Sequence, residues 1–238
     1  CYGENKLGSI ASDLAKHGYA TAFFHGGYNG TMNFDNYTKK IGFEHYYGKN
    51  EYNNDADYDG NWGIYDEPFL QYVVKQMDTI SKPFVSALFT LSSHHPYSIP
   101  EQHIGRFPKG SMIVHETVGY TDYALKRFFE QAAKTKWYDN TLFIITSDHS
   151  ALTSQKEFKT QLGLFKIPMI VFHPQLTQGV VSDRIMQQID VYPTIADLIH
   201  LEDRIFCFGH SAFSSEYDFY IYYTNGEYLL LSDGYLSK

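Results

Sequence analysis

Residues 142–150, LFIITSDHS, form an apolar run that ends on an acid and an imidazole, Asp148 and His149. An apolar strand of this kind needs cover on both faces, which is how parallel sheets of α/β proteins are built. In such sheets ligands bind at the carboxyl ends of the strands. The stretch therefore predicts both the fold class and the place of the functional site.

Apolar strands alternate with amphipathic helices along most of the chain, and the last part is a hairpin around Asn225 and Gly226, the strongest short hairpin signal. Such alternation is typical of a sheet with helices packed on both faces. We therefore expect one α/β domain over residues 1–238, with a largely parallel sheet flanked by helices on both faces and a C-terminal antiparallel hairpin. The expected helices are residues 9–17, 35–41, 66–80, 114–136 and 183–202, the last interrupted at Pro193. Strands are expected within residues 19–24, 83–91, 142–147 and 167–174.

The composition limits the classes of partner. The 238 residues carry a formal net charge of −8 and no run rich in Lys or Arg, which argues against nucleic acid, because binding to the phosphate backbone depends on clustered cations. No stretch of about 18 apolar residues occurs, so no segment of this sequence is expected to span a membrane. An anionic substrate would need compensating charge, most economically from a metal ion.

Asp148 and His149 are the first candidate site. Neighbours in a regular strand point to opposite faces, but the turn after the strand can bring both side chains towards one point. A carboxylate oxygen and an imidazole nitrogen together suit zinc, manganese or a similar divalent ion. The alternative is an Asp that accepts backbone N–H bonds with an incidental His beside it, and the dipeptide alone does not separate the two.

Histidines also follow two other apolar strands. His25 comes directly after one, and His94 with His95 comes shortly after the next. The carboxyl ends of parallel strands share one edge of a sheet, so we expect these imidazoles to lie near the Asp-His pair. Convergent imidazoles could bind a tetrahedral anion, protonate a leaving oxygen or ligate a metal. We expect only one of the adjacent pair to face the site, because extended neighbours diverge.

A long segment separates the first predicted strand from the next predicted long helix. Residues 28–62 are rich in Tyr, Asn, Asp and Gly and predict a surface excursion, a feature that in compact domains is often functional. Gly26 and Gly27 before it fit either a tight turn or a close approach of the backbone to a ligand. We expect Trp62, at the end of this segment, to pack against the rest of the domain and anchor the excursion. The alternative is that its ring lines the site.

Six segments of the chain occur in an order that characterises one protein family. They are residues 9–27 (SIASDLAKHGYATAFFHGG), 33–48 (NFDNYTKKIGFEHYYG), 62–70 (WGIYDEPFL), 91–100 (LSSHHPYSIP), 120–150 (YTDYALKRFFEQAAKTKWYDNTLFIITSDHS) and 187–199 (QQIDVYPTIADLI). In this order they resemble the sulfatase-like phosphoglycerol transferases, the lipoteichoic acid synthase family within the alkaline phosphatase superfamily. The resemblance runs over nearly the whole chain.

The resemblance implies an extracytoplasmic catalytic domain, periplasmic or at the cell surface, attached to the cytoplasmic membrane only through an N-terminal region outside this sequence. It implies transfer of a phosphoglycerol group from a lipid-linked donor to an envelope glycan or lipid acceptor, through a covalent threonine intermediate. It also implies a divalent ion, usually manganese with zinc or magnesium as alternatives, held by Asp148 and His149 together with a glutamate and the nucleophilic threonine.

In the family, the glutamate and the threonine precede the helix that matches residues 9–17. Here that helix begins almost at Cys1, so the resemblance implies an N-terminally truncated domain whose catalytic nucleophile lies upstream of Cys1. We expect the 238-residue polypeptide alone to turn over nothing.

The resemblance places the substrate-binding histidines at His25 and His94. An arginine and a tryptophan that contact phosphate in lipoteichoic acid synthase itself match Phe34 and Met32 here, and this departure bears on whether phosphatidylglycerol is the donor. The sequence NFDN at residues 33–36 instead resembles the Gram-negative branch of the family, which modifies glucans or other envelope acceptors.

Other functions remain open. A sulfatase would need a Cys or Ser in a C/S-x-P-x-R context, which neither Cys1 nor Cys207 has, although the upstream segment could hold it. A phosphoethanolamine transferase is a further variant. The alternative of another class is a non-catalytic envelope-binding domain that retains the fold, and Met32 and Phe34 favour it.

Overall fold

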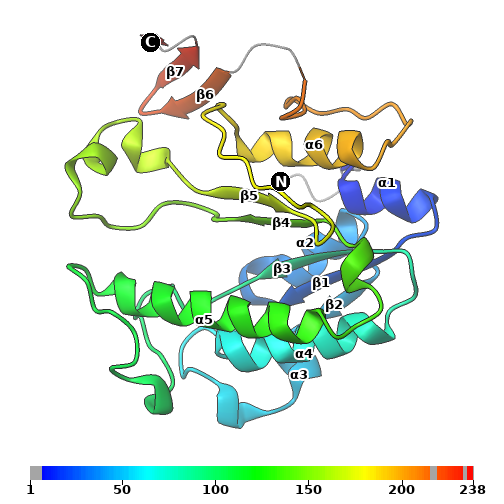
Figure 1. Cartoon of the computed structure of the whole chain (residues 1–238), viewed down its shortest axis with the longest axis vertical. Helices are drawn as coiled ribbons and strands as arrows, with labels where there is room; N and C mark the ends of the chain where they lie inside the picture. The colour runs from blue at the N-terminus through cyan, green and yellow to red at the C-terminus, as the bar shows by residue number, and fades with distance from the viewer. Residues whose placement is uncertain (1–6, 215–218, 233–234, 238) are drawn as a thin grey trace. The chain divides into compact units, whose positions relative to one another are not determined.

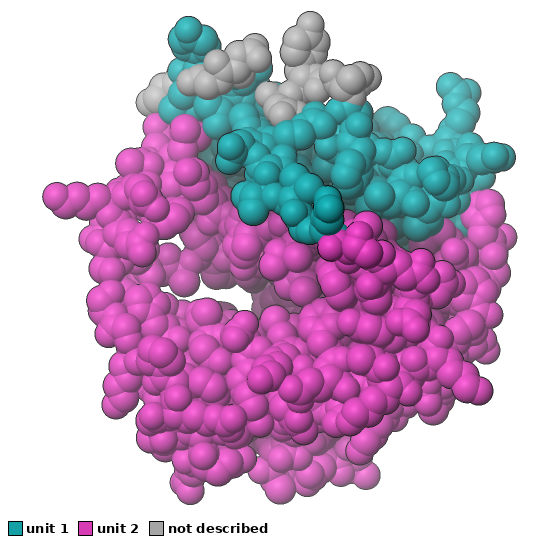
Figure 2. Space-filling view, viewed as in Figure 1, with its two compact units in different colours: residues 1–13, 178–238 teal, residues 14–177 magenta. Residues whose placement is uncertain are grey.

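The computed structural model describes residues 7–214, 219–232 and 235–237, so Cys1 lies outside the described residues. The chain forms two compact units, which Figure 2 shows in different colours. The large unit comprises residues 14–177, and the small unit comprises residues 1–13 and 178–238. Every residue for which the sequence predicts a metal or substrate contact belongs to the large unit. The expectation of one domain over the whole chain stays a prediction.

The large unit contains a three-stranded parallel sheet in the order β2-β1-β3. The strands are β1 (Ala20–His25), β2 (His45–Tyr47) and β3 (Phe84–Phe89). The register pairs His25 with Phe89, so β1 and β3 end at the same edge of the sheet. The expected shared carboxyl edge is therefore confirmed for these two strands.

Helices cover both faces of this sheet (Figure 1). α4 (Asp66–Thr79) and α5 (Val114–Ala132) pack on one face, where the fully buried Ala22 and Phe24 of β1 join the hydrophobic core. α2 (Phe34–Lys40) covers the other face, where the ring of Phe34 lies 6.1 Å from that of Phe23. Because side chains alternate along a strand, Phe23 and His25 share the face that α2 covers. The expected α/β class with helices on both faces is confirmed.

The strand that precedes the Asp-His pair departs from the expectation. β4 (Phe143–Thr146) runs in the same direction as β3 in Figure 1, but it pairs antiparallel with β5 (Met169–Phe172). Among the described residues, β3 pairs only with β1, and β4 pairs only with β5. With one edge unpaired, the side chains of both strands stay partly exposed. The expectation that this strand is covered on both faces is therefore wrong for this structure.

Short elements complete the large unit. Phe84 at the start of β3 and Phe143 at the start of β4 both contact Trp137, with ring centroids 5.8 and 6.4 Å from the indole. The remaining elements are α3 (Lys49–Tyr52) and the 3-10 helices η1 (Thr31–Asn33), η2 (Asp55–Asp57), η3 (Glu101–His103), η4 (Tyr138–Asn140), η5 (Lys156–Lys159) and η6 (Gly163–Phe165). α1 (Ile10–Lys16), the expected first helix, spans the boundary between the units.

The small unit contains the C-terminal hairpin. β6 (Phe219–Thr224), β7 (Glu227–Ser232) and β8 (Tyr235–Ser237) form an antiparallel sheet, and Asn225 and Gly226 connect the first two with φ of 51° and 83°. Both turn residues take the left-handed conformation that this kind of hairpin requires, so the hairpin is confirmed.

The helix around Pro193 is not interrupted as expected. The 3-10 helix η7 (Gln188–Asp190) leads directly into α6 (Val191–Leu198), which places Pro193 in the first turn of α6. The first-turn N–H groups of a helix have no acceptor within the helix, so the missing N–H of proline costs little there. Within the described ranges, no helix is long and apolar enough to cross a membrane.

Candidate functional site

His25 ends β1 inside an aromatic cage. Its imidazole is 2% exposed and lies 4.8 Å from the ring of Phe34 and 5.7 Å from that of Phe89, centroid to centroid. Its Nδ1 lies 3.2 Å from the hydroxyl of Tyr46 on β2. The strand alternation directs His25 towards α2, and Phe34 at the start of that helix covers it. A substrate that contacts His25 would first have to displace this cover.

Burial also sets the charge of His25. Desolvation lowers its pKa from 6.5 to about 4, so the imidazole is neutral at pH 7. Burial, with smaller contributions from Asp35 and Glu51, raises the pKa of Tyr46 to about 12, so its hydroxyl keeps its proton and can donate to Nδ1. His25 therefore offers hydrogen bonds to a ligand rather than positive charge.

The glycines after His25 are needed for close packing within the protein. A Cβ atom on Gly27 would lie 2.6 Å from Cε1 of His25, and one on Gly63 would lie 2.4 Å from the carbonyl oxygen of Gly26. Side chains at these positions would displace either the imidazole or the neighbouring backbone. The two chain segments meet here, because the N–H of Ile64 donates to the carbonyl of Gly26 at 3.0 Å.

His94 lies in the loop after β3 and is exposed. Its ring stands edge-on to the indole of Trp62, with centroids 4.3 Å apart. The indole nitrogen of Trp62 donates to the carbonyl oxygen of His95 at 2.6 Å. These contacts fit both interpretations of Trp62, because they tie the end of the excursion to the loop after β3 and place its ring directly against a predicted site residue.

The short segment from Trp62 to Ile64 connects the two predicted substrate-binding histidines. Gly63 forms an antiparallel bridge with Gly27, two residues beyond His25, while Trp62 contacts His94. The structure therefore brings His25 and His94 to the same end of the sheet, as expected. They differ in access, since the first imidazole is enclosed and the second is exposed.

Asp66 is a structural residue of this site that sequence reasoning missed. It is the first residue of α4 and is 2% exposed, and its Oδ1 accepts the N–H groups of Leu91 and Ser92 at 2.8 and 3.0 Å. Its Oδ2 accepts the hydroxyl of Thr121 on α5 at 2.7 Å, and burial raises its pKa. The acid at a helix start was the available signal, because carboxylates are favoured there. Asp66 thereby fixes the start of the loop that carries His94.

Asp148 and His149 turn their side chains towards each other. Oδ2 of Asp148 lies 3.4 Å from Nε2 of His149, and both side chains are more than half exposed. Oδ1 of Asp148 accepts the backbone N–H of His149 at 2.8 Å. Nδ1 of His149 lies 2.8 Å from the carbonyl oxygen of Ser150, which can only accept, so Nδ1 carries a hydrogen. The expectation that the turn after the strand brings both side chains to one point agrees with this geometry.

The pair fits a divalent ion. With Nδ1 protonated, a neutral His149 presents the lone pair of Nε2 to the carboxylate, and a carbonyl-bonded Nδ1 is the usual arrangement of a metal-ligating histidine. A carboxylate oxygen and an imidazole nitrogen that lie 3.4 Å apart are close enough to bind one ion together, and both are donor types that zinc and manganese accept. A proton on Nε2 would instead give an exposed ion pair, which stabilises a fold little.

The pair is at most part of a metal site. Across residues 7–214, 219–232 and 235–237, no group of three or more His, Cys, Asp or Glu side chains could hold a metal ion. Zinc and manganese take at least four ligands in most proteins, so further ligands would have to come from elsewhere. β4 runs in the same direction as β3 in Figure 1, which places the pair beyond the same end of its strand as His94.

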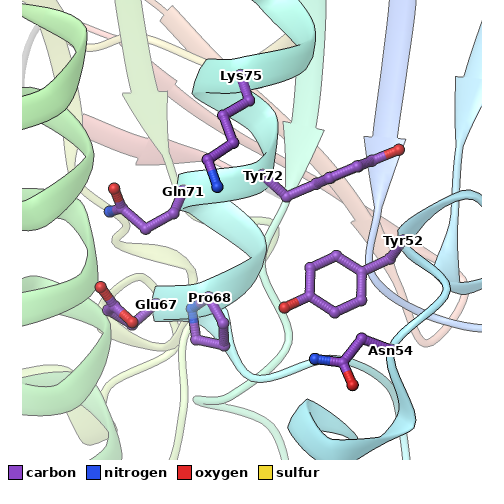
Figure 3. Close-up of a pocket in the computed structure, with 7 residues that line it drawn as sticks. All are labelled: Tyr52, Asn54, Glu67, Pro68, Gln71, Tyr72 and Lys75. Carbon is purple, nitrogen blue, oxygen red and sulfur yellow. The ribbon is translucent and has the colours of Figure 1, made fainter.

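A surface cavity lies away from these residues. It measures about 390 Å³ and sits on the outer side of α4, as Figure 3 shows. None of the four predicted site residues lines it. Its walls are Tyr52, Asn54, Glu67, Pro68, Gln71, Tyr72 and Lys75. This cavity is therefore not the site predicted at the strand ends.

Comparisons with known proteins agree with this fold. The family model described as Sulfatase matches residues 3–201. Lipoteichoic acid synthase 1 of Bacillus subtilis is 28% identical over 249 residues, a match that covers 95% of this chain and 38% of the relative. The chain thus spans well under half the length of this curated relative.

Solved structures match the whole chain. A protein in the alkaline phosphatase superfamily from Vibrio parahaemolyticus matches with a TM-score of 0.85 and 26% identity, covering 100% of this chain and 61% of that one. The lipoteichoic acid synthase LtaP from Listeria monocytogenes matches with a TM-score of 0.76 and 19% identity, covering 100% of this chain and 68% of that one. The second likeness concerns the fold alone.

Proposed function

Because this chain belongs to the sulfatase family, we propose that its full-length protein transfers, or hydrolyses, a phosphoglycerol-type phosphate ester in a metal-dependent reaction. The similarity to a lipoteichoic acid synthase supports this class of reaction. The single observation that carries the proposal is the geometry of Asp148 and His149, whose donor atoms lie 3.4 Å apart in an exposed position. The described chain then holds part of the active site.

The proposed ion is manganese, with zinc or magnesium as alternatives, and Asp148 and His149 would hold it. Such an ion lowers the pKa of a coordinated hydroxyl and offsets charge on the phosphate. The carbonyl of Ser150 orients the imidazole through Nδ1, and the N–H of His149 orients the carboxylate through Oδ1. These contacts fix both ligands before an ion binds.

The remaining ligands and the hydroxyl nucleophile are proposed to come from chain outside the 238 residues. β3 and β4 support this, because both are apolar strands with one edge that no described strand pairs. Figure 2 shows openings through the large unit. A strand that enters between β3 and β4 would pair both edges, cover their partly exposed side chains and end near Asp148. This is the proposed route by which the nucleophile reaches the site.

His25 and His94 are proposed to contact the phosphate ester, and His94 is also proposed to accept a proton. His94 is exposed and can contact a phosphate oxygen or accept a proton from an attacking hydroxyl. His25 is neutral and enclosed, so it can contribute a hydrogen bond only after Phe34 moves. Phe34 and the 76% exposed Met32 supply no positive charge at positions that match phosphate-contacting residues in lipoteichoic acid synthase. The proposed donor is therefore a lipid-linked phosphoglycerol compound, without commitment to phosphatidylglycerol.

The proposed place of action is the outer side of the cytoplasmic membrane, where an envelope glycan or lipid would be the acceptor. The similarity to lipoteichoic acid synthase supports this location. Attachment to the membrane would reside in sequence outside the 238 residues. No nucleic-acid partner is proposed for a chain with a formal net charge of −8.

One observation favours a second candidate, a non-catalytic envelope-binding domain. The cover of Phe34 over His25 leaves that imidazole 2% exposed, which a substrate-contacting residue would not need. A sulfatase or a phosphoethanolamine transferase would share the Asp-His pair but act on another ester. These possibilities differ in which donor the protein turns over and in whether turnover needs a metal ion.

The test is a transfer assay with the full-length protein, manganese and a panel of donors: phosphatidylglycerol, other lipid-linked phosphoglycerol compounds, phosphatidylethanolamine and an aryl sulfate. We expect release of diacylglycerol from a phosphoglycerol donor, with loss of activity by a factor of at least about 100 in Asp148→Ala and His149→Ala. His173→Ala, a change at the end of the neighbouring β5, is the matched control and should retain activity. Turnover of the sulfate alone, or no turnover of any donor, would refute the proposed function.

A further inference from the structure

Trp62 and His94 share one hydrogen-bond acceptor, the carbonyl oxygen of His95. The indole Nε1 of Trp62 lies 2.6 Å from this oxygen, and the imidazole Nδ1 of His94 lies 2.8 Å from it. A carbonyl oxygen has two lone pairs and cannot donate, so both nitrogens carry a hydrogen. A neutral His94 therefore has its hydrogen on Nδ1 and its lone pair on Nε2.

Trp62 is itself held firmly in place. Oδ1 of Asp59 accepts the backbone N–H groups of Asn61, Trp62 and Gly63 at 2.8, 2.8 and 3.1 Å. Gly63 packs so closely that a Cβ there would lie 2.4 Å from the carbonyl oxygen of Gly26. The indole ring then stands against the imidazole of His94 at an interplanar angle of 65°. These contacts leave Trp62 little freedom to move away from His95.

The loop that carries His94 is fixed from its other side by Asp66. The carboxylate of Asp66 binds the N–H groups of Leu91 and Ser92, and the N–H of Asp66 donates to the hydroxyl of Ser92 at 2.9 Å. The N–H of His94 in turn donates to the carbonyl of Leu91 at 3.0 Å. Asp66 thus fixes the backbone at the start of this loop. Trp62 instead donates a hydrogen bond to the carbonyl of His95, which also accepts one from the imidazole of His94.

We infer that Trp62 is a positioning residue for His94: through the carbonyl of His95 it holds the imidazole in the Nδ1–H tautomer and leaves Nε2 as the proton acceptor. The catalytic use of Nε2 rests on the proposed function. In that reaction the O–H bond of an attacking hydroxyl breaks, its electron pair stays on oxygen, and the proton passes to Nε2 to give an imidazolium. The tautomer itself does not depend on that reaction.

The test measures the tautomer directly. The whole chain is labelled with ¹⁵N-histidine, and the imidazole nitrogens are observed by NMR at about pH 8, where a histidine with the ordinary pKa is neutral. His94→Gln identifies the His94 signals by their loss. In the unsubstituted protein we expect a protonated Nδ1 and an unprotonated Nε2. In Trp62→Phe, which keeps a ring but lacks the N–H, we expect both signals to shift towards the Nε2–H form.

Trp137→Phe is the matched control, because the indole N–H of Trp137 has no hydrogen-bond partner among the residues that the structure describes. This variant should leave the His94 signals unchanged. The inference is overturned if His94 carries its hydrogen on Nε2 in the unsubstituted protein, if Trp62→Phe leaves its signals unchanged, or if Trp137→Phe shifts them equally. A protein that turns over no ester but shows the expected spectra would refute the proposed function and support this inference.

Discussion

The ring of Phe34 lies 4.8 Å from the imidazole of His25, centroid to centroid, and encloses a residue that the resemblance assigns to substrate binding. The contact joins the first residue of α2 to the last residue of β1. Together with Phe89 and Tyr46, Phe34 buries this imidazole, which is 2% exposed and whose pKa is lowered by burial. Access to this part of the site therefore depends on α2.

Phe34→Ala should open the cage around His25. Removal of the ring lets water reach the imidazole, so the charged form is no longer disfavoured and its pKa should rise from about 4 towards 6.5. NMR titration of the histidine ring protons measures the change. Phe43→Ala is the control, because Phe43 packs on Phe23 on the same face and is not among the rings around His25. An unchanged His25 pKa in Phe34→Ala would contradict the assigned cause.

The lowered pKa of His25 should make the fold sensitive to acid. Between pH 6.5 and about 4 the unfolded chain binds a proton at this position and the folded chain does not, so the free energy of unfolding falls as the pH drops. The slope from this group approaches about 1.4 kcal/mol per pH unit. Urea unfolding at several pH values should show a smaller slope in His25→Gln than in the unsubstituted protein. Equal slopes would rule out His25 as the source.

Asp66→Ala should destabilise the large unit by about 3 kcal/mol, because the change leaves the N–H groups of Leu91 and Ser92 and the hydroxyl of Thr121 without their buried acceptor. Asp66→Asn is the matched variant. It keeps one acceptor oxygen for the two N–H groups and removes a buried charge, so it should cost about 1 kcal/mol or less. Denaturant unfolding measures both. Equal losses in the two variants would show that these hydrogen bonds are not what Asp66 contributes.

The unpaired edges of β3 and β4 give a prediction for hydrogen exchange. In the 238-residue chain, the amides on those edges should exchange quickly, because no described strand accepts from them. In the full-length protein they should be protected if a strand enters between β3 and β4. β1 is paired on both sides and serves as the internal control, with protection in both proteins. Fast exchange at these edges in the full-length protein would refute the proposed strand.

Hydrophobic pattern and turn chemistry predict most of the fold. The alternation of apolar strands and amphipathic helices indicates the α/β class, and Asn225-Gly226 predicts the hairpin. The local sequence pattern does not show which strands pair when the two strands are far apart in the chain. Residues 143–146 read as a strand covered on both faces, but nothing in that run indicates that β5 pairs with it antiparallel. The sequence around Pro193 predicts an interruption, because it does not show that α6 begins only at Val191, after a 3-10 turn, which places the proline in the first turn.

The candidate site was predicted in part. The position of His25 at a strand end follows from the apolar run before it, whereas its enclosure depends on Phe34, nine positions further along and folded back over the sheet. The contact of Asp148 with His149 was an expectation from the turn after the strand, and the atoms do lie close together. The acid at the start of α4 is visible in the sequence, but its hydrogen bonds to Leu91 and Thr121 are not, because these partners are far away in the chain. Metal binding and substrate contacts stay predictions.

Asp148 and His149 are proposed to hold the catalytic metal ion together. The most direct test is anomalous diffraction at the manganese edge from crystals of the full-length protein grown with Mn²⁺. We expect one anomalous peak within about 2.4 Å of both a carboxylate oxygen of Asp148 and Nε2 of His149. A manganese peak elsewhere with none at this pair, or no bound manganese, zinc or magnesium at the pair at all, would contradict it.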